Sequence, residues 1–327
     1  GSLVQAEDEL ASINMVIGAS FGGVPSMTAT SGPGLALMLE ALGLSVAAEV
    51  PSLVVNVQRG GPSTGVPTKS EQVDLDIALH GMHGDAPHLV LGALDHADCV
   101  LTTEWAVRLA EALQTVAIVL TDQNLAQSRA LIPEPDYTLP GIPARRTAGP
   151  DENYQRYEIT ADGVSPMAIP GTACSTYVAD GLEHTQTGKP STAAADHAAQ
   201  MDKRLHKIEQ FDYGELWADV RGEGDTAILT WGSTTAAARE AAERLLDAGE
   251  SVKVIAPRLL MPSRPEEMSR VLDGVRRVLV VEQSHGRQFH RYLRSYYDID
   301  AEVRNLARPG PLLITPGEIV RSIEEWK

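Results

Sequence analysis

The chain has few cysteines, few aromatic residues and no long apolar run. Its two cysteines, Cys99 and Cys174, are far apart and form no CxxC motif, which excludes a disulfide framework and an iron–sulfur cluster held by this chain alone. Two cysteines are compatible with a reducing cytoplasm, where we expect the protein to reside. Aromatic residues make up only 5% of the sequence, so the core must be mainly aliphatic. No apolar run approaches the length of a membrane span, and we expect no transmembrane segment.

Positive charge is also scarce, because 27 lysine and arginine residues face 44 aspartate and glutamate residues. The formal net charge of −17 argues against binding to nucleic acid, whose phosphates favour clusters of lysine and arginine. It argues equally against binding to an anionic membrane surface. An anionic substrate must therefore be attracted by local cations rather than by the overall field of the protein.

The 327 residues exceed what one compact core usually holds, and two runs of alternating elements predict two domains. In the first run, strands are expected over 24–30, 51–58, 97–103 and 114–122, and helices over 34–49 and 69–80. In the second run, strands are expected over 225–232, 251–257, 276–283 and 301–306, and helices over 234–249 and 264–275. Such alternation is typical of an α/β fold in which helices cover both faces of a parallel sheet.

The pattern fails between about Leu131 and Thr192, where prolines and glycines dominate. Ordered segments of this length are usually functional or wrap a partner, so a passive linker is not expected here. A helix is expected to follow, from Ala193 to about Gln210. We therefore predict a first domain over residues 1–132, a connecting segment and helix over 133–205, and a second domain over 206–327.

The first candidate binding element is the stretch VVNVQRGGPSTGVPTK, residues 54–69. It begins as an apolar strand and continues at the carboxyl edge of the sheet, where open α/β folds bind ligands. Arg59 is the cation at the start of this glycine- and proline-rich loop, and its planar head suits a carboxylate or a phosphate. Pairing with a structural acid explains that arginine equally well. Thr68 and Glu71 fit a capping box, which predicts that the next helix starts there.

The second candidate is a glutamate near the amino end, where VQAEDELASINMVIGAS predicts a helix that begins near Ala6. Its first turn holds three acids, Glu7, Asp8 and Glu9. The helix dipole favours negative charge in that turn, which is explanation enough for all three. Only Glu9 shares a face with Ile13 and Val16, which are expected to be buried. A carboxylate on such a face has a raised pKa unless it is partnered, and this suits proton transfer.

Four other stretches have more than one interpretation. TATSGPGLALMLE (28–40) is a strand–turn–helix element, and it lacks the G-x-S-x-G spacing of a serine hydrolase. HGMHGDAPH (80–88) could bind a metal through histidine and aspartate, although one loop does not make a metal site. WGST (231–234) could cradle a phosphate, or its serine could cap a helix. EQSHGRQFHRYLR (282–294) is basic and could face a cofactor, another subunit or solvent.

Five stretches occur in an order that resembles one family. They are QAEDELASINMVIGAS, TATSGPG, VQRGGPSTGVPT, GMHGDAP and RYEITADGVSPMAIPG. Together they resemble the alpha subunit of 2-oxoacid:ferredoxin oxidoreductases, and within that family the 2-oxoglutarate type. The resemblance implies a thiamine diphosphate-dependent enzyme that oxidatively decarboxylates a 2-oxoacid with coenzyme A, giving acyl-CoA, CO2 and reduced ferredoxin. It also implies two doubly wound domains, a pyrimidine-binding domain and a transketolase C-terminal-like domain.

The resemblance further implies roles for particular residues. Glu9 matches the family glutamate that contacts the aminopyrimidine ring of the cofactor, and Arg59 matches the arginine that holds the substrate carboxylate. Thr64 is a candidate for substrate binding, and Thr64, Lys69 and the partner chain are all open as contacts of the distal substrate group. The TATSGPG and HGD loops match family positions on the cofactor side, at Thr30, Ser31, Gly32, His83 and Asp85. No metal ligand is expected in this chain.

Departures from the family pattern imply partners. The chain lacks the G-D-G…N element that binds Mg²⁺ and the diphosphate, so the resemblance implies a beta subunit that supplies this element and a 4Fe–4S cluster. An (αβ)2 heterotetramer that reduces ferredoxin is expected. The Y-P-I-T-P-S segment that precedes the glutamate helix in the family is absent, as is a further amino-terminal domain of many members. We therefore expect a fragment, or a protein whose remainder is a separate piece, and a first domain that lacks one strand.

Two other functions are compatible with the same residues. The chain could belong to a transketolase-like or dehydrogenase-type thiamine diphosphate enzyme that uses no ferredoxin. It could also be a non-catalytic assembly subunit that has kept the fold. Iron in the purified complex would count against the first alternative, and a loss of rate after replacement of Glu9 by Gln would count against the second.

Overall fold

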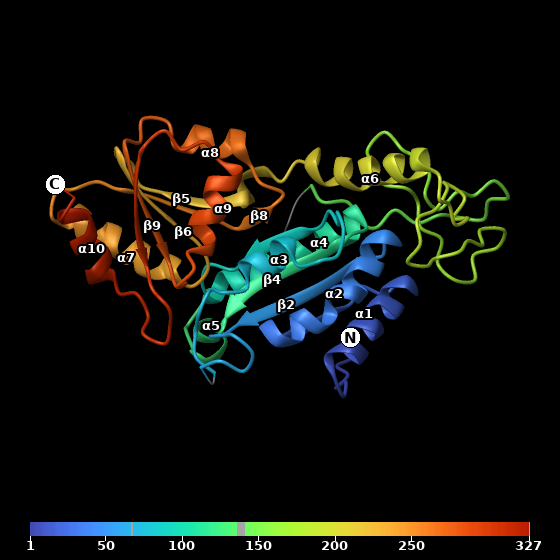
Figure 1. The fold of residues 1–327 in the computed structure, drawn as a ribbon, viewed down its shortest axis with the longest axis horizontal. Coiled ribbons are helices and arrows are strands. Elements are labelled where there is room, and N and C mark those ends of the chain that lie inside the picture. The colour runs from blue at the N-terminus through green and yellow to red at the C-terminus, as the bar shows by residue number, and fades with distance from the viewer. Residues whose placement is uncertain (67, 136–140, 327) are drawn as a thin grey trace.

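The computed structural model describes residues 1–66, 68–135 and 141–326. Figure 1 shows an elongated molecule with one β-sheet and its helices in the middle, a second sheet at one end, and a long irregular segment with one helix at the other end. Both sheets are mixed and mainly parallel. The expected α/β class with two doubly wound domains is therefore confirmed.

The first sheet has the strand order β1-β2-β4-β3-β8. Its strands are β1 (Met27–Thr30), β2 (Ser52–Gln58), β3 (Leu89–Gly92), β4 (Val116–Asp122) and β8 (Leu259–Met261). Its helices are α1 (Glu9–Phe21), α2 (Gly32–Ala47), α3 (Leu75–His80), α4 (His96–Leu113) and α5 (Gln123–Gln127). The first four strands run parallel, whereas β8, which comes from far along the chain, pairs antiparallel with β3.

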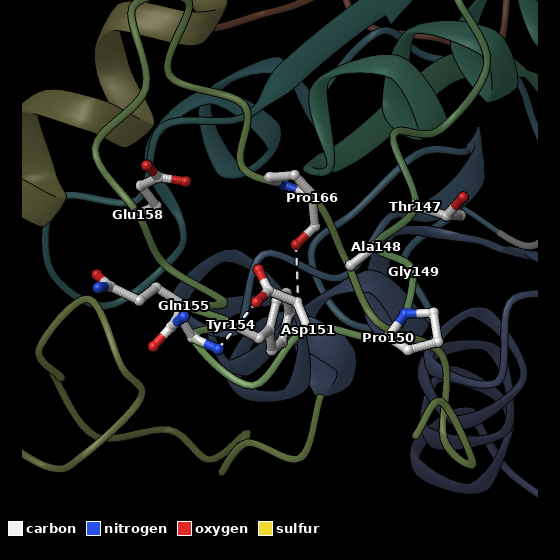
Figure 2. Close-up of a pocket in the computed structure, with 10 residues that line it drawn as sticks. Thr147, Ala148, Gly149, Pro150, Asp151, Tyr154, Gln155, Glu158 and Pro166 are labelled. Atoms are coloured by element: carbon white, nitrogen blue, oxygen red, sulfur yellow. Dashed lines mark hydrogen bonds between the residues drawn. The ribbon is translucent and has the colours of Figure 1, made fainter. Parts of the chain in front are cut away.

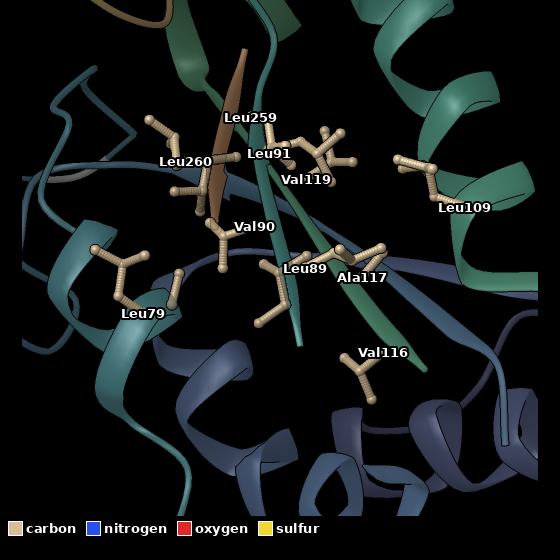
Figure 3. Close-up of a cluster of buried hydrophobic side chains, with 14 of the residues drawn as sticks. Leu79, Leu89, Val90, Leu91, Leu109, Val116, Ala117, Val119, Leu259 and Leu260 are labelled. Atoms are coloured by element: carbon tan, nitrogen blue, oxygen red, sulfur yellow. The ribbon is translucent and has the colours of Figure 1, made fainter. Parts of the chain in front are cut away.

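Strand β4 lies inside the sheet because its side chains can be covered on both faces. All its residues are buried, and the run from Val116 to Leu120 contains no polar side chain. Figure 3 shows Leu79 of α3 and Leu109 of α4 on opposite sides of β3, so helices cover both faces of the sheet. Leu259 of β8 belongs to the same buried cluster, which therefore includes side chains from both halves of the chain.

The second sheet has the strand order β10-β9-β6-β7-β5. Its strands are β5 (Ala218–Arg221), β6 (Thr226–Thr230), β7 (Lys253–Pro257), β9 (Arg277–Glu282) and β10 (Glu302–Ala307). Four helices belong to this half, α7 (Thr234–Asp247), α8 (Pro265–Val271), α9 (Gln288–Tyr296) and α10 (Pro316–Glu324), and α6 (Ala194–Glu209) precedes it. Strand β5 is antiparallel to β7, and the other strands run parallel. The division into domains at residues 132 and 205 stays a prediction.

The strand expected over 97–103 is wrong, because these residues lie in α4. The strand of this region is β3, over residues 89–92. Asp95 caps α4 by accepting a hydrogen bond from the amide of Asp98 at 2.9 Å. The Asp98 carboxylate in turn accepts hydrogen bonds from the Thr102 hydroxyl and from the guanidinium of Arg258. Capping and these long-range contacts override the strand propensity of the β-branched side chains.

The helix expected over 69–80 begins only at Leu75, as α3. Thr68 has a positive φ of 48°, and the Glu71 carboxylate accepts a hydrogen bond from the amide of Gly310 at 2.7 Å. The predicted capping box is therefore wrong, because its glutamate binds the second half of the chain rather than the start of a helix. Residues 69–74 instead connect the Arg59 loop to α3 without regular structure.

Buried charges attach the irregular segment, residues 128–135 and 141–193, and the helix α6 that follows it to the amino end of the first sheet. Glu49, at the turn before β2, lies 2.7 Å from both Lys203 and Lys207 of α6. All three side chains are buried. Burial opposes the charged carboxylate, but the two ammonium groups hold the pKa of Glu49 far below its usual range. The buried Arg156 of the segment donates to the carbonyl of Glu49 at 2.7 Å, which completes the attachment.

Candidate active site

The carboxyl ends of the parallel strands bring several predicted residues to one edge of the first sheet. β1 ends at Thr30, β2 at Gln58 and β4 at Asp122. Loops that follow neighbouring parallel strands meet at such an edge. The TSGPG turn, residues 30–34, follows β1. The Arg59 loop, residues 59–69, follows β2.

Glu9 lies beside the TSGPG turn. Asp8 caps α1 by accepting from the amide of Ala11 at 2.7 Å, so the half-buried Glu9 carboxylate has no capping role. A side chain at Gly34 would place its Cβ 1.9 Å from the Thr30 hydroxyl oxygen and 2.7 Å from Cγ of Glu9. The glycine therefore allows α1 and α2 to approach closely enough to bring Glu9 and Thr30 together. Ile13 and Val16 are buried, as expected for the face that Glu9 shares.

The start of α2 also contacts an acid that the sequence analysis did not select. A Cβ at Gly32 would lie 2.7 and 2.8 Å from the two carboxylate oxygens of Asp74. Asp74 accepts a hydrogen bond from the Asn56 amide at 2.9 Å, and its own backbone amide donates to Gln58. Burial raises the pKa of Asp74, against the opposing effects of Asn56 and Arg59. The signal in the sequence was an acid shortly after a glycine-rich loop, which is too common to single out.

Arg59 opens a loop whose two ends are joined. The amide of Gly60 donates to the carbonyl of Lys69 at 2.8 Å, and the amide of Gly65 donates to the carbonyl of Pro62. Gly65 has a φ of 51° and lies so close to Gly60 that a Cβ would meet its carbonyl oxygen at 1.9 Å. This close approach explains the glycines of the loop.

The Arg59 guanidinium has no partner among the residues that the structure describes. It makes neither a hydrogen bond nor an ion pair with them, and its Nε is buried without an acceptor. Buried donors of this kind are usually satisfied, and a planar guanidinium suits an anionic ligand such as a carboxylate. The interpretation of Arg59 as a partner of a structural acid is therefore not supported in the described part of the chain.

The remaining predicted residues are less closely assembled. Thr64 and Lys69 are exposed on the Arg59 loop, and His83 and Asp85 are exposed on the loop after α3. The Ser31 side chain precedes α2 but forms no capping hydrogen bond. Among the described residues, no hydrogen bond or ion pair connects these five to Glu9 or Arg59.

The HGMHGDAPH stretch does not assemble a metal site in the described part of the chain, where no group of three His, Cys, Asp or Glu side chains could hold a metal ion. The His88 ring is buried, and each of its nitrogens lies 2.7 Å from a backbone carbonyl oxygen. Burial lowers the pKa of His88. His80 stacks on Tyr296 of α9, with ring centroids 6.4 Å apart.

The WGST stretch connects the two sheets. Ser233 forms no capping bond to α7; its hydroxyl donates instead to Asp122 at the end of β4. Burial raises the pKa of Asp122. The carbonyl of Trp231 accepts a hydrogen bond from the Gln72 side chain at 2.7 Å. Both contacts place the carboxyl end of β6 against the edge of the first sheet that carries Glu9 and Arg59.

Most of the basic stretch after β9 lies in helix α9. The charged side chains occupy one face of this helix, and the opposite face is apolar. Phe289, Tyr292 and Leu293 are buried, whereas Arg291 and Arg294 are exposed. The start of the helix is capped from the preceding strand, because the Glu282 carboxylate accepts from the amides of the residues at 289 and 290, both at 2.9 Å. Burial raises the pKa of Glu282 to about 7 despite these two bonds.

Two hollows lie away from this edge. One has a volume of about 480 Å³ and is formed within the irregular segment, where Figure 2 shows Asp151, Gln155 and Glu158 around it. Tyr154 lines it as well, but its hydroxyl is already bonded to the carbonyl of Pro166 at 2.9 Å. The other hollow, of about 760 Å³, lies between α6, β8 and α8. Neither contains a residue predicted for the site.

Comparison with known proteins identifies the family. Residues 1–203 match the family described as "Pyruvate flavodoxin/ferredoxin oxidoreductase, thiamine diP-bdg". The chain belongs to this family. Residues 216–318 match the transketolase C-terminal domain. The resemblance seen in the five ordered stretches is thereby confirmed.

Relatives within the family carry related names. The 2-oxoglutarate oxidoreductase subunit KorA of Mycobacterium tuberculosis is 37% identical over 303 residues, which are 91% of this chain and 46% of that protein. The 2-oxoglutarate synthase subunit KorA of Methanothermobacter marburgensis is 31% identical over 334 residues, covering 100% of this chain and 87% of that protein. The chain spans about half the length of several curated relatives that it matches.

A solved structure matches almost the whole chain. It is the 2-oxoglutarate:ferredoxin oxidoreductase from Magnetococcus marinus with 2-oxoglutarate, coenzyme A and succinyl-CoA bound. The match covers 99% of this chain and 57% of that one, with a TM-score of 0.92 and 43% sequence identity. Across the described ranges of our chain, no helix combines the length and the apolarity needed to cross a membrane.

Proposed function

We propose that this chain is part of an enzyme that oxidatively decarboxylates a 2-oxoacid, with 2-oxoglutarate as the preferred substrate. Coenzyme A accepts the acyl group, CO2 is released, and ferredoxin accepts the electrons. The observation that carries the proposal is the match, over 99% of the chain and at 43% identity, to a 2-oxoglutarate:ferredoxin oxidoreductase with substrate and coenzyme A bound. The geometry at the edge of the first sheet supports it.

The pyrimidine end of thiamine diphosphate fits that edge. The Glu9 carboxylate is half-buried, takes no part in capping, and packs closely against Gly34 and Thr30. When bound, thiamine diphosphate supplies the carbanion chemistry that releases CO2 from a 2-oxoacid. In this proposal the Glu9 carboxylate holds the proton that it shares with a ring nitrogen.

The neighbouring residues complete the cofactor side in this proposal. Thr30, Ser31 and Gly32 line the ring, because the TSGPG turn is the part of the chain that faces Glu9. His83 and Asp85 form the outer rim on their exposed loop, where a partner subunit can cover them.

Arg59 holds the substrate carboxylate next to the keto group. Its guanidinium has no acceptor among the described residues, and a carboxylate can receive two parallel hydrogen bonds from it. Thr64 and Lys69 lie further along the same loop and are exposed. We assign the distal carboxylate of 2-oxoglutarate to one of these two or to the partner chain.

The proposal requires a second subunit. The described residues offer no cluster of three metal-binding side chains, and the two cysteines are not paired and lie far apart in the sequence. We therefore assign Mg²⁺, the diphosphate and a 4Fe–4S cluster to a beta subunit in an (αβ)2 complex, which passes electrons to ferredoxin in the cytoplasm.

Purification of the chain with its native partners tests this function. We expect a brown, iron-containing complex that reduces a viologen dye with 2-oxoglutarate and coenzyme A, and more slowly with pyruvate or a branched-chain 2-oxoacid. Turnover without iron would favour a thiamine diphosphate enzyme that uses no ferredoxin. An intact complex that is inactive with every 2-oxoacid would favour an assembly subunit and refute the proposal.

A further inference from the structure

Asp74 has no role in the proposed function, yet it contacts both the TSGPG turn and the end of β2, directly before Arg59. Its carboxylate lies against Gly32 in the TSGPG turn, on the cofactor side of the site. Its backbone amide donates at 3.0 Å to the side chain of Gln58, the residue directly before Arg59. The Glu9 carboxylate lies against the same helix start, next to Gly34.

The position of Asp74 suggests that its side chain caps α3, but the structure excludes this role. Asp74 is the residue before α3, and an aspartate there normally caps the helix through its side chain. The Asp74 side chain makes no capping hydrogen bond. It turns instead toward β2, where the buried Asn56 amide donates to it at 2.9 Å. The carboxylate is thus directed at the site and not at its own helix.

Two glutamines that follow β9 hold the residues on either side of Asp74. The Gln72 backbone amide donates to the carbonyl of Gln283 at 2.8 Å, and its side-chain oxygen accepts from the amide of Gln283 at 2.7 Å. The Gln288 side chain donates to the carbonyl of Val73 at 2.8 Å and accepts from the amide of Asp76 at 3.0 Å. These bonds fix the backbone on both sides of Asp74 from outside the first domain.

We propose that Asp74 is a positioning residue for Arg59, and that the second domain holds it in place through Gln72 and Gln288. The Asp74 carboxylate draws the guanidinium toward the TSGPG turn without pairing with it, so the head of Arg59 stays free for the substrate. Glu71, anchored to Gly310, adds a second negative charge near Gly60 on the loop. This inference rests on the proposed function of Arg59 as the substrate clamp.

Asp74→Asn in the complete complex is the direct test, because the change removes the charge and keeps the shape. We expect the KM for 2-oxoglutarate to rise about tenfold, as for the loss of one partly buried charge interaction, with kcat changed much less. The Kd of the unreactive dicarboxylate glutarate should rise by a similar factor in calorimetry. The matched control is Asp76→Asn, since the Asp76 carboxylate pairs with Arg291 at the surface. Equal effects of the two variants would overturn the proposal.

The pH dependence separates a charge effect from a merely structural one. The charged groups that act on Asp74 are Arg59 and Glu71. As the pH falls through the raised pKa of Asp74, the wild-type carboxyl becomes neutral, so the glutarate affinities of wild type and Asp74→Asn should converge. A ratio of affinities that stays constant with pH contradicts the positioning role.

Gln288→Ala tests the part played by the second domain. The Gln288 side chain bridges the residues on both sides of Asp74 but touches neither Arg59 nor Glu9 in the described structure. We expect a rise in the glutarate Kd in the same direction as for Asp74→Asn, and no further rise when both changes are combined. Additive effects would show that Gln288 does not act through Asp74. A wild-type complex that binds glutarate normally but turns over no 2-oxoacid would refute the proposed function alone.

Discussion

Glu9 and Asp8 are neighbouring carboxylates with different uses. Asp8 satisfies the amide of Ala11 at the start of α1, which leaves Glu9 free to face the TSGPG turn. The sequence placed both acids in one helical turn, and only the burial of Ile13 and Val16 on the face of Glu9 distinguished them. At the scale of single residues, the candidate site thus uses a carboxylate, that of Glu9, which has no capping role in the fold.

The Glu9→Gln variant should lose most of its activity while the complex stays intact. An amide cannot hold the shared proton that we assign to the Glu9 carboxylate, and such proton transfers contribute about 10²- to 10⁴-fold to rates. The measurement is 2-oxoglutarate-dependent viologen reduction by the purified complex. Glu7→Gln is the control, because Glu7 is exposed and lies just before the cap residue. A normal rate for Glu9→Gln would remove Glu9 from catalysis.

Arg59→Ala should weaken substrate binding more than it slows turnover. Hydrogen bonds to a charged group are worth about 1.5–3 kcal/mol, which corresponds to a rise of roughly 10- to 150-fold in KM. Steady-state kinetics with 2-oxoglutarate measure this change. Arg270→Ala provides a comparison, because Arg270 is 74% exposed and its ion pair with Glu267 spans 3.9 Å. Unchanged KM and kcat would show that the carboxylate clamp lies elsewhere.

At the scale of helices and strands, the sequence predicted most of the long elements, with the 18-residue α4 as an exception, and it predicted short ones poorly. Strands β2 and β4 carry continuous apolar runs, and α2 and α7 have long stretches without proline, so local pattern sufficed. Strand β8 is three residues long and pairs with a strand about 170 positions earlier in the chain. Its existence depends on the packing of the two halves, which no local pattern contains.

Asp74 was missed for a related reason. Its neighbours in the sequence predicted a helix over 69–80, which would have placed it on a solvated helical face. Three of the partners that hold its neighbours Gln72, Val73 and Asp76 are Gln283, Gln288 and Trp231, all more than 150 positions away. The candidate residues Glu9 and Arg59, by contrast, follow from short stretches whose local pattern is preserved in the fold.

Helix α9 should respond to pH through its capping residue. Burial raises the pKa of Glu282 to about 7, so the folded protein keeps a proton that the unfolded chain releases near pH 4.5. The free energy of unfolding should therefore fall as the pH rises from about 4.5 to about 7, by roughly 3 kcal/mol for a shift of this size.

The Glu282→Gln variant keeps an acceptor for α9 but does not titrate. We expect urea unfolding of this variant to lack most of that pH dependence, whereas Glu240→Gln on the surface should retain it. Equal slopes for wild type and Glu282→Gln between pH 5 and 8 would show that this carboxyl is not the group responsible.

At the scale of the whole molecule, the two sheets are not separable units. Strand β8 belongs by sequence to the second half and by pairing to the first sheet. Arg258 next to it forms a buried ion pair with Asp98 of α4, with a nitrogen–oxygen distance of 2.7 Å. The Gln72 contacts and the bond from Ser233 to Asp122 add polar links between the same two halves.

A fragment that ends at residue 210 should not fold as a stable domain. It would lack β8, leave the edge of β3 unpaired and expose the apolar cluster around Leu259. We expect a broad, non-cooperative thermal transition by circular dichroism, and recovery of a sharp transition when residues 211–327 are co-expressed. A fragment that unfolds as cooperatively as the full chain would show that the first sheet is independent.

The bond between Gly60 and Lys69 has a consequence for how this family can diversify. This bond brings the two ends of the Arg59 loop together where the loop leaves β2. Insertions or deletions between these two positions cost little closure entropy and need not move β2 or Asp74. A change in loop length can therefore alter which distal substrate groups the site accepts, while β2 and Asp74 keep their positions.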